Sequence, residues 1–402
     1  MTGVVNVSYL RCVDGHSIGV LELDNPESLN ALTLNMHKTL HQYLQLWYED
    51  ESIVAVIIKS VGERAFCAGG DVRSMYYAMN NDPVLNHLDT PPNIPLAEVD
   101  SHIAKPFLTE YFTVEYSCNY LIHNYNKPII AWGHGFIMGG GLGLYIGASH
   151  RVVQPNSILA MPEISIGLYP DVGATWFLNQ LPSGIGLFLG LTGSHVNAVD
   201  ARDLKMIEHI IDGASLNKVE QQLVQYSWST SLDKSERQQA LNEAVSMILT
   251  ESEIDEIDQL PANQLTPYYA QIQAACSQQS LSIIIEQINA IDGLGGWIET
   301  AKQNLNAGSP ITAHICFKQL RDYKDASLLD CIKMELGLSV NCGLVGEFKE
   351  GVRAQLIDKD HQPQWLYSSV NAVDESLIEQ MFASTWLENK NPLVISHSGN
   401  YL

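Results

Sequence analysis

The fold is decided by a glycine run, Met138-Gly139-Gly140-Gly141-Leu142-Gly143-Leu144, which opens an apolar helix pattern. The start of a helix presents backbone N–H groups without partners in a preceding turn, and the positive end of the helix dipole lies behind them. Such donors suit an oxyanion that develops during acyl chemistry. Taken alone, the run is equally consistent with close packing of a helix on a sheet, because glycine carries no side chain.

A second stretch follows, Met161-Pro162-Glu163-Ile164-Ser165-Ile166-Gly167-Leu168-Tyr169-Pro170-Asp171-Val172-Gly173. It sets two carboxylates, Glu163 and Asp171, among apolar residues, prolines and glycines. Glu163 is predicted to be a partly buried carboxylate with a raised pKa, suited to a general base; the alternative is a salt-bridged or exposed carboxylate at a strand end. Asp171 is predicted to serve in the same site, and its position also fits an N-cap for a helix over residues 172–180.

Strand and helix patterns alternate over the first 200 residues, which is typical of an α/β fold. Thr33 is the expected N-cap of the first helix, and residues 81–106, rich in Pro and Asn, are predicted to be a surface excursion without regular structure. Long polar helical patterns dominate from about residue 215. We therefore predict two domains, residues 1–210 and residues 211–402. The predicted strands cover residues 4–11, 18–23, 53–59, 129–132, 151–154 and 158–161.

The charge of the chain narrows the classes of partner. The 402 residues carry 45 acidic against 22 basic side chains, a net charge of −23. Nucleic-acid binding needs a basic footprint, so a nucleic-acid partner is not expected, and docking on anionic lipid is not expected either. No apolar run reaches the roughly 18 residues of a membrane span, and no secretory signal is visible at the N-terminus.

The seven cysteines are widely spaced and include no Cys-x-x-Cys pair, so we expect reduced thiols in a cytoplasmic protein. Cys67 is interpreted as a small apolar packing residue rather than a nucleophile. Neither a dinucleotide fingerprint, a Walker motif nor an HExxH helix is present, and the histidines are scattered, so no catalytic metal is expected.

Together these segments resemble the enoyl-CoA hydratase/isomerase (crotonase) superfamily. The order and spacing are similar to that family's for five pieces: Asn30-Ala31-Leu32, Ala65-Phe66-Cys67-Ala68-Gly69-Gly70-Asp71, Lys127-Pro128, the glycine run and Pro162-Glu163. Within the family the chain looks most like the 3-hydroxyisobutyryl-CoA hydrolase branch. The pieces that favour this branch are residues 30–36, 66–73, 161–173, 347–354 and 356–360.

The resemblance implies a crotonase-like spiral of β-β-α repeats followed by a helical C-terminal region, with an acyl-CoA thioester as substrate. It places the oxyanion hole on the N–H groups of Gly70 and Gly140. Leu29 and Ala68 would hold the adenosine end of coenzyme A, and Glu115 would contact the substrate. Glu27 stands where many relatives have a basic residue, so the resemblance assigns no phosphate contact to that loop.

One departure separates two reactions. Hydratases of this superfamily carry a glutamate where this chain has Gly143, and glycine where it has Asp171, so the resemblance implies a hydrolase that uses Glu163 and Asp171. The implied reaction is hydrolysis of 3-hydroxyisobutyryl-CoA in valine breakdown, with coenzyme A as part of the substrate and no other cofactor. The alternatives are a hydratase or isomerase with a single catalytic glutamate and a catalytically silent acyl-CoA-binding scaffold. The family also includes trimers, so a homo-oligomer is an option.

Overall fold

The computed structural model describes residues 3–87, 95–228, 234–254, 260–293, 296–386 and 390–393. The chain forms two compact units that alternate along the sequence. The first unit holds Met1–Gly70, Ser117–Leu159 and Val196–Gln264, and the second holds Asp71–Tyr116, Ala160–His195 and Leu265–Leu402. These units are interleaved, whereas the sequence suggested a single division at residue 210; that division remains a prediction.

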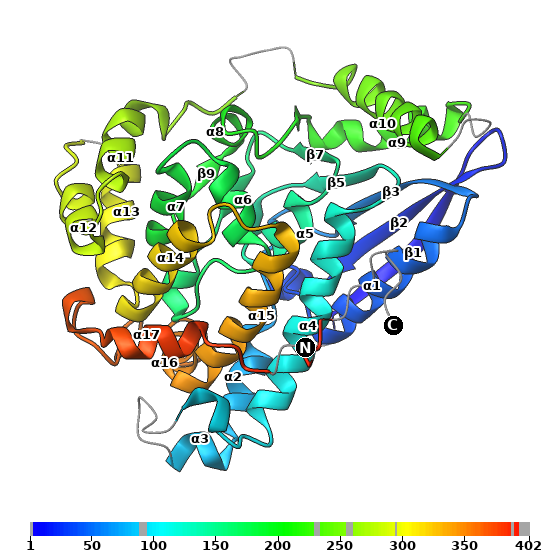
Figure 1. Ribbon diagram of the computed structural model, residues 1–402. Coiled ribbons are helices and arrows are strands. Elements are labelled where there is room, and N and C mark those ends of the chain that lie inside the picture. Colours follow the sequence, from blue (N-terminus) through cyan, green and yellow to red (C-terminus); the bar gives the residue numbers. More distant parts are fainter. Residues whose placement is uncertain are drawn as a thin grey trace. The chain divides into compact units, whose positions relative to one another are not determined.

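A six-stranded sheet in the order β1-β2-β3-β5-β7-β10 forms the frame of the first unit (Figure 1). Strands β1 and β2 form an antiparallel hairpin, and the other described neighbours in this sheet run parallel. The apolar runs of β3 and β5 are buried along almost their whole length, as expected for parallel strands. The strands are Val4–Arg11, Ser17–Asp24, Ile53–Ser60, Ile129–Gly133, His150–Val153 and His209–Ile210.

A second sheet has the order β4-β6-β8-β9. Its first three members follow β3, β5 and β7 directly in the chain, so each successive pair gives one strand to each sheet. Helices α2 (Val72–Asn80) and α5 (Gly140–Ile146) follow two of these pairs. This is the predicted spiral of β-β-α repeats. The strands of the second sheet are Ala65–Cys67, Phe136–Met138, Ile158–Ala160 and Val196–Asn197.

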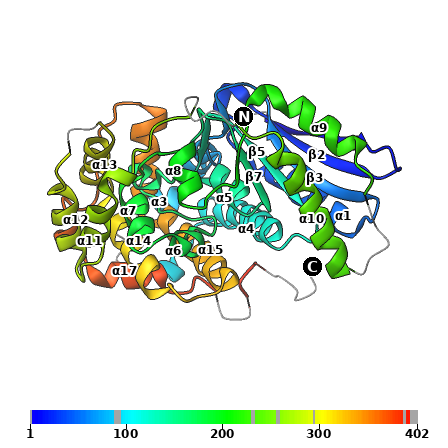
Figure 2. The same cartoon turned by 90° about the horizontal axis from the view of Figure 1, so that it is seen from above.

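Two helices cover one face of the larger sheet. Figure 2 shows α9 (Leu216–Gln225) and α10 (Lys234–Thr250) beside β2 and β3. Buried side chains of both helices, among them Leu223 and Val245, form one apolar cluster with Ile18 and Val54 of the sheet. Burying a side chain of this size stabilises the fold by about 1.5–3 kcal/mol relative to exposure.

Both ends of helix α1 (Leu34–Glu49) are bonded by residues that the sequence analysis singled out, Thr33 and Lys127. The Thr33 hydroxyl accepts the N–H of Met36 at 3.2 Å, which confirms the predicted N-cap. At the other end, the buried ammonium group of Lys127 donates to the carbonyl oxygens of Trp47 and Asp50. Burial lowers the pKa of Lys127 to about 8.

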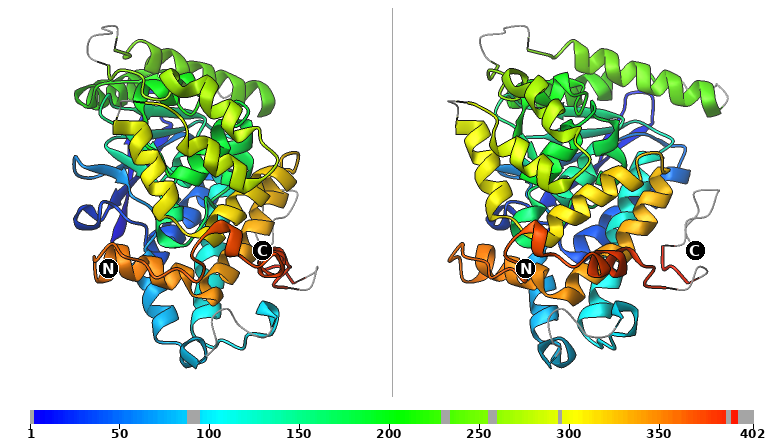
Figure 3. Two further views of the ribbon diagram at one scale, coloured as in Figure 1. Left: turned by 90° about the vertical axis from the view of Figure 1, so that its left-hand side faces the viewer. Right: turned by 60° about the vertical axis from the view of Figure 1, so that its left-hand side comes forward.

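The described elements of the second unit are mainly helices. Helix α15 packs against α6, α16 and α17, and Figure 3 shows the orange α15 and red-orange α17 close together. The α-helices of this unit are α2, α3 (Pro83–His87), α6 (Ala174–Gln180), α7 (Ile185–Thr192), α11 (Tyr269–Cys276), α12 (Leu281–Asn289), α13 (Gly296–Ala307), α14 (Pro310–Asp322), α15 (Leu328–Val345), α16 (Glu347–Val352), α17 (Glu375–Phe382) and the first part of α4 (Ala104–His123).

The prediction of an irregular excursion over residues 81–106 is wrong for the described part of that segment. It contains α3, a 3-10 turn over Leu96–Glu98 and the start of α4. The reason is Asp82, whose buried carboxylate accepts the N–H groups of Val84 at 2.9 Å and of Ala104 at 2.9 Å. The Asp82 side chain therefore caps the N-termini of two helices. The high content of Pro and Asn in this segment predicted irregular structure instead.

Two expectations concern the chain as a whole. Among the residues described, no helix combines the length and apolar character needed to cross a membrane. All seven cysteines belong to the described residues, and each is buried and outside any disulfide.

Candidate active site

The predicted donor residues come together within the first unit. Gly140 is the first residue of α5, so its N–H has no acceptor in a preceding turn. The turn that contains Gly70 lies against this point, because a Cβ atom on Gly69 would be 3.8 Å from the Gly140 nitrogen. Leu32 donates its N–H to the Gly69 carbonyl at 2.9 Å and fixes that turn. The structure thus brings Gly70 and Gly140 into one neighbourhood, while their role as an oxyanion hole remains a prediction.

The glycine run also packs closely against a neighbouring strand, which confirms the second interpretation of it. A Cβ atom on Gly141 would lie 2.4 Å from the carbonyl oxygen and 2.8 Å from the sulfur of Cys67. Helix α5 therefore touches β4 with no room for a side chain. Cys67 is fully buried in this contact, in agreement with its predicted packing role.

Gly141→Ala is expected to destabilise the fold by about 1–3 kcal/mol, because the new methyl group meets backbone that has to shift. Urea unfolding measures this loss. The control is Gly296→Ala at the start of α13, where nothing lies within 4 Å of the added Cβ. Equal unfolding midpoints for the two variants would contradict the argument.

The two residues predicted to hold coenzyme A, Leu29 and Ala68, are joined by a backbone hydrogen bond. Ala68 donates its N–H to the Leu29 carbonyl at 3.0 Å, and Leu29 and Asn30 both have positive φ, 54° and 56°. The Asn30 amide holds this strained turn by donating to the carbonyls of Val61 and Ala65, each at 2.9 Å. The turn therefore has a fixed shape before any ligand binds.

A pocket of about 220 Å³ adjoins this turn. Sequence reasoning noted an acidic Glu27 in the loop and missed Arg64, whose guanidinium group donates to the Pro26 carbonyl at 3.2 Å. Arg64 supplies a cation at a wall where the sequence predicted none. The pocket is lined by Pro26, Glu27, Leu29, Asn30, Val61, Gly62, Glu63, Arg64 and Ala65.

The predicted carboxylates lie in the second unit. Glu163 is only 5% exposed, and its Oε2 has no hydrogen-bond partner among the residues described. Burial raises the pKa of Glu163 to about 8, and the nearby Glu115 carboxylate raises it as well. The prediction of a buried carboxylate with a raised pKa is thereby confirmed, and the alternative of an exposed strand-end residue is wrong.

The turn that carries Glu163 is tightly held. Glu163 opens a 3-10 turn over Glu163–Ile166, and Ser309 donates its N–H to the Ile164 carbonyl at 3.1 Å. Two glycines allow other segments to touch this turn, since a Cβ on Gly308 would lie 2.5 Å from the Ile164 side chain and one on Gly351 would lie 2.2 Å from the Ile166 backbone. The backbone of the turn that carries Glu163 is thus held by the segments around it.

Asp171 is buried, but it does not cap a helix. Val172 and Gly173 both have positive φ and separate Asp171 from α6, which begins at Ala174. The N-terminus of α6 is instead capped by Glu335, whose carboxylate accepts the N–H groups of Gly173 at 2.7 Å and Thr175 at 2.9 Å. The N-cap prediction is therefore wrong, and the Asp171 carboxyl group is available for other contacts.

The carboxyl group of Asp171 is hydrogen-bonded to the Tyr116 hydroxyl group, with 2.5 Å between the two oxygen atoms. Its pKa lies well above the ordinary value because of burial, followed by the charges of Glu115 and Glu163. Glu115, from α4, is 2% exposed and acts on both other acids. The structure thus brings together three predicted residues, Glu115, Glu163 and Asp171, as a cluster of buried acids.

Sequence reasoning missed the residues around Asp171. Ser339 and Glu335 lie four positions apart in the apolar helix α15 and are fully buried. Polar residues at this spacing in an apolar helix share one face, which was the available signal. Tyr116 gave no comparable signal, because aromatic residues are frequent throughout α4.

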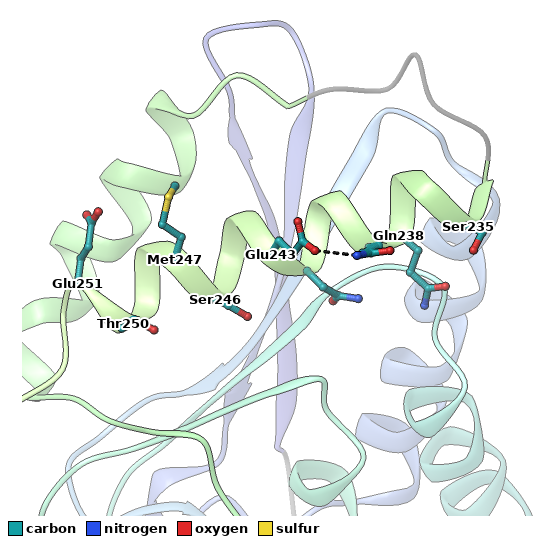
Figure 4. Close-up of a pocket in the computed structure, with 9 residues that line it drawn as sticks. Ser235, Gln238, Glu243, Ser246, Met247, Thr250 and Glu251 are labelled. Atoms are coloured by element: carbon teal, nitrogen blue, oxygen red, sulfur yellow. Dashed lines mark hydrogen bonds between the residues drawn. The ribbon is translucent and has the colours of Figure 1, made fainter.

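A groove of about 780 Å³ runs along α10 in the first unit, and Figure 4 shows that the side chains on its wall come from α10 and its end. A hydrogen bond of 2.8 Å joins Gln239 and Glu243 there. None of the predicted site residues lines it. Within the described part of the chain, no group of three or more His, Cys, Asp or Glu residues is arranged to hold a metal ion.

The fold and these residues match one family. The chain fits the model of the Enoyl-CoA hydratase/isomerase family over residues 18–382. The chain therefore belongs to the enoyl-CoA hydratase/isomerase family, as the resemblance predicted.

Individual proteins can be compared with the chain over nearly its whole length. It is 32% identical to a mitochondrial 3-hydroxyisobutyryl-CoA hydrolase of Danio rerio over 366 residues, 91% of this chain and 87% of the relative. The corresponding hydrolase of Homo sapiens is 33% identical over 366 residues, covering 91% and 86%.

Solved structures confirm the predicted fold class. A carnitinyl-CoA dehydratase from Mycobacterium thermoresistibile superposes with a TM-score of 0.76 at 26% identity, covering 96% of this chain and 99% of that one. An enoyl-CoA hydratase from Rhodobacter sphaeroides 2.4.1 gives a TM-score of 0.74 at 26% identity, covering 94% and 97%.

Proposed function

We propose that the protein is an acyl-CoA thioester hydrolase that converts 3-hydroxyisobutyryl-CoA to 3-hydroxyisobutyrate and coenzyme A. The observation that carries this proposal is the pair of buried acids Glu163 and Asp171, together with a glycine at position 143 where a hydratase would need a second glutamate. The hydrolases of Danio rerio and Homo sapiens, at 32% and 33% identity, support the same reaction.

The proposed chemistry uses backbone donors and one base. The thioester oxygen accepts hydrogen bonds from the N–H groups of Gly70 and Gly140, which strengthen as negative charge develops on it; one such donor lowers the barrier by roughly 3–4 kcal/mol. Ionised Glu163 takes a proton from water as the water oxygen bonds to the carbonyl carbon. The carbon–sulfur bond then breaks, and coenzyme A leaves as a thiolate that takes the proton from Glu163. In a second route, Glu163 attacks directly and water opens the resulting anhydride.

The remaining parts of the proposal concern binding. Asp171 accepts or donates a hydrogen bond at the 3-hydroxyl group, with Glu115 at the same end of the acyl chain. Leu29 and Ala68 hold the adenosine end of coenzyme A through backbone atoms, and Arg64 offers a cation beside them. Coenzyme A belongs to the substrate, so no further cofactor is proposed.

Release of free thiol tests the function directly, using 3-hydroxyisobutyryl-CoA beside acetyl-CoA and crotonyl-CoA. Fast release from the hydroxyacyl ester supports the hydrolase. Loss of the crotonyl absorbance without thiol release would instead make the protein a hydratase with a single catalytic glutamate. Binding of the esters without either reaction would make it a silent acyl-CoA-binding protein.

The pH dependence of hydrolysis is expected to follow the ionisation of Glu163. A general base acts in its ionised form, and the pKa of Glu163 is raised to about 8. The value of kcat/KM is therefore expected to fall by about tenfold per pH unit below pH 8. Initial rates between pH 6 and 9 measure this; a flat profile over that range would remove Glu163 as the base.

Three further points stay proposals. The reaction fits valine breakdown. A cytoplasmic location rests on the reduced cysteines, whereas the hydrolases of Danio rerio and Homo sapiens are mitochondrial proteins. Cell fractionation decides between the two compartments. Assembly as a homo-oligomer is tested by light scattering.

A further inference from the structure

Four hydrogen bonds run in a row from Asp171 to the backbone of Glu335, all within the second unit. The Asp171 Oδ2 and Tyr116 Oη atoms are 2.5 Å apart, and Tyr116 Oη and Ser339 Oγ are 2.6 Å apart. Ser339 Oγ and Tyr169 Oη are 2.8 Å apart, and the Tyr169 hydroxyl donates to the backbone carbonyl of Glu335 at 2.9 Å. The three hydroxyl residues are fully buried.

The number of hydrogens in this row decides the state of Asp171. Each hydroxyl carries one hydrogen and can donate one bond, so Tyr116, Ser339 and Tyr169 supply three hydrogens for four bonds. The carbonyl group at the Glu335 end has no hydrogen to give. A fourth hydrogen therefore has to come from the other end, which is the carboxyl group of Asp171. If Asp171 is ionised, one of the four contacts joins two oxygens with no hydrogen between them.

We infer that the hydroxyl chain Tyr116–Ser339–Tyr169 keeps Asp171 in its protonated form. In that form every bond has one donor: Asp171 donates to Tyr116, Tyr116 to Ser339, Ser339 to Tyr169, and Tyr169 to the Glu335 carbonyl. A buried polar group left without its hydrogen bond costs about 1–3 kcal/mol, and this cost falls on the ionised form alone. Tyr116, Ser339 and Tyr169 are thus positioning residues that act through Asp171.

The charges around Asp171 act in the same direction. Its strongest electrostatic neighbours are Glu115 from α4 and Glu163 from the 3-10 turn, followed by Glu335 from α15. The thiol of Cys342, also from α15, and the two phenols face it as well. All these groups are acids, and like charges that share a buried site do not all ionise.

A neutral Asp171 favours the ionisation of Glu163 that catalysis needs, and this effect rests on the proposed function. Glu163 has to ionise to act as a base, and a second negative charge beside it opposes that step. With Asp171 neutral, Glu163 is the only one of these two acids that carries a negative charge. The second oxygen of Asp171, Oδ1, takes no part in the hydrogen-bond row and is left to accept the 3-hydroxyl group of the substrate.

Carbon-13 NMR of protein labelled at the aspartate side-chain carboxyl carbons measures the protonation of Asp171 without any reaction. The signal that is missing from the Asp171→Asn variant belongs to Asp171. In the wild type it is expected at the position of a protonated carboxyl group at neutral pH, and to move to the carboxylate position only at higher pH.

Ser339→Ala and Tyr169→Phe interrupt the row of hydrogen bonds at different points, and both are expected to shift the titration of Asp171 to lower pH. Removing the hydroxyl group with Ser339→Ala or Tyr169→Phe leaves two bonds and two hydrogens, so an ionised Asp171 is fully satisfied by Tyr116. Tyr116→Phe removes the one side-chain donor to the carboxylate that the described residues provide, and Asp171 in that variant is not expected to ionise at lower pH. Ser339→Thr keeps a hydroxyl group and is expected to restore the wild-type titration.

The control is Thr312→Val, which removes a buried hydroxyl group of the second unit that has no partner among the described residues. Its Asp171 signal is expected to titrate as in the wild type. A carboxylate signal in the wild type at neutral pH would overturn the inference, as would an unchanged titration in the Ser339 and Tyr169 variants. If one of these two does not fold, the other carries the test. A failed thiol-release assay would reject the proposed function and leave this measurement unaffected.

Discussion

Glu163→Gln is expected to lower the hydrolysis of 3-hydroxyisobutyryl-CoA by about 10²–10⁴-fold, the usual contribution of a general base. Glutamine keeps the size and hydrogen-bonding atoms of the side chain but cannot take a proton or attack a carbonyl group. Thiol release under saturating substrate measures the loss in kcat. Binding of the CoA ester is expected to remain, because no contact to coenzyme A is removed.

The same variant is expected to be more stable than the wild type at neutral and higher pH. Burial raises the pKa of Glu163 from 4.5 to about 8, so the folded state has to hold a costly charge once the pH exceeds 8. Stability is therefore greatest below the unfolded pKa and is lost as the pH rises through about 8, and glutamine escapes this loss. The difference in Tm between the two proteins should grow from pH 5 to pH 9.

The control for both effects is Glu379→Gln on α17, which removes an equal charge from a side chain that is 70% exposed. It is expected to leave turnover and the pH dependence of Tm unchanged. Near-normal hydrolysis by Glu163→Gln would exclude Glu163 from the chemistry, and a Tm difference independent of pH would contradict its buried, raised pKa.

Asp171→Ala is expected to reduce kcat/KM for 3-hydroxyisobutyryl-CoA by about 10–100-fold while reducing the slower hydrolysis of acetyl-CoA much less. The reason is that only the hydroxyacyl ester offers a group for Asp171 to bind, and losing a hydrogen bond in a buried site costs about 1–3 kcal/mol. Parallel thiol-release assays with the two esters give the ratio directly.

Asp171→Asn separates this binding role from a need for charge. Asparagine retains one acceptor oxygen and has N–H groups that can donate to Tyr116, as a protonated aspartate does. It is expected to keep more of the preference for the hydroxyacyl ester than Asp171→Ala does. Equal losses on both esters in the alanine variant would show that Asp171 does not recognise the hydroxyl group.

The sequence predicted the strands of the core well, because strands that are buried in a sheet need runs of apolar residues, and such runs can be seen in the sequence. The strands β1, β2, β3, β5, β7 and β8 lie within a residue or two of the predicted ranges. Where it failed, a single long-range contact overrides the local pattern. Asp82 joins the start of α3 to the start of α4 across about 20 residues, and no local signal reports such a contact.

The candidate site was predictable where its chemistry lies in short motifs, as with Glu163 and the glycine run. Its supporting residues were not, because they depend on which segments meet after folding. Glu335 takes the capping role expected of Asp171, although it lies more than 160 residues further along the chain. The roles of Gly70, Gly140, Glu115, Leu29 and Ala68 remain predictions.

The seven buried cysteines have a practical consequence. A thiol reagent reacts with the thiolate form, and burial raises the pKa of Cys12, Cys276 and Cys331, the last two to about 12. The native protein is therefore expected to be silent toward a colorimetric thiol reagent. The reagent then reports only the coenzyme A that is released by turnover. In denaturant, the rate at which the same reagent reacts with the cysteines measures the rate at which unfolding exposes them.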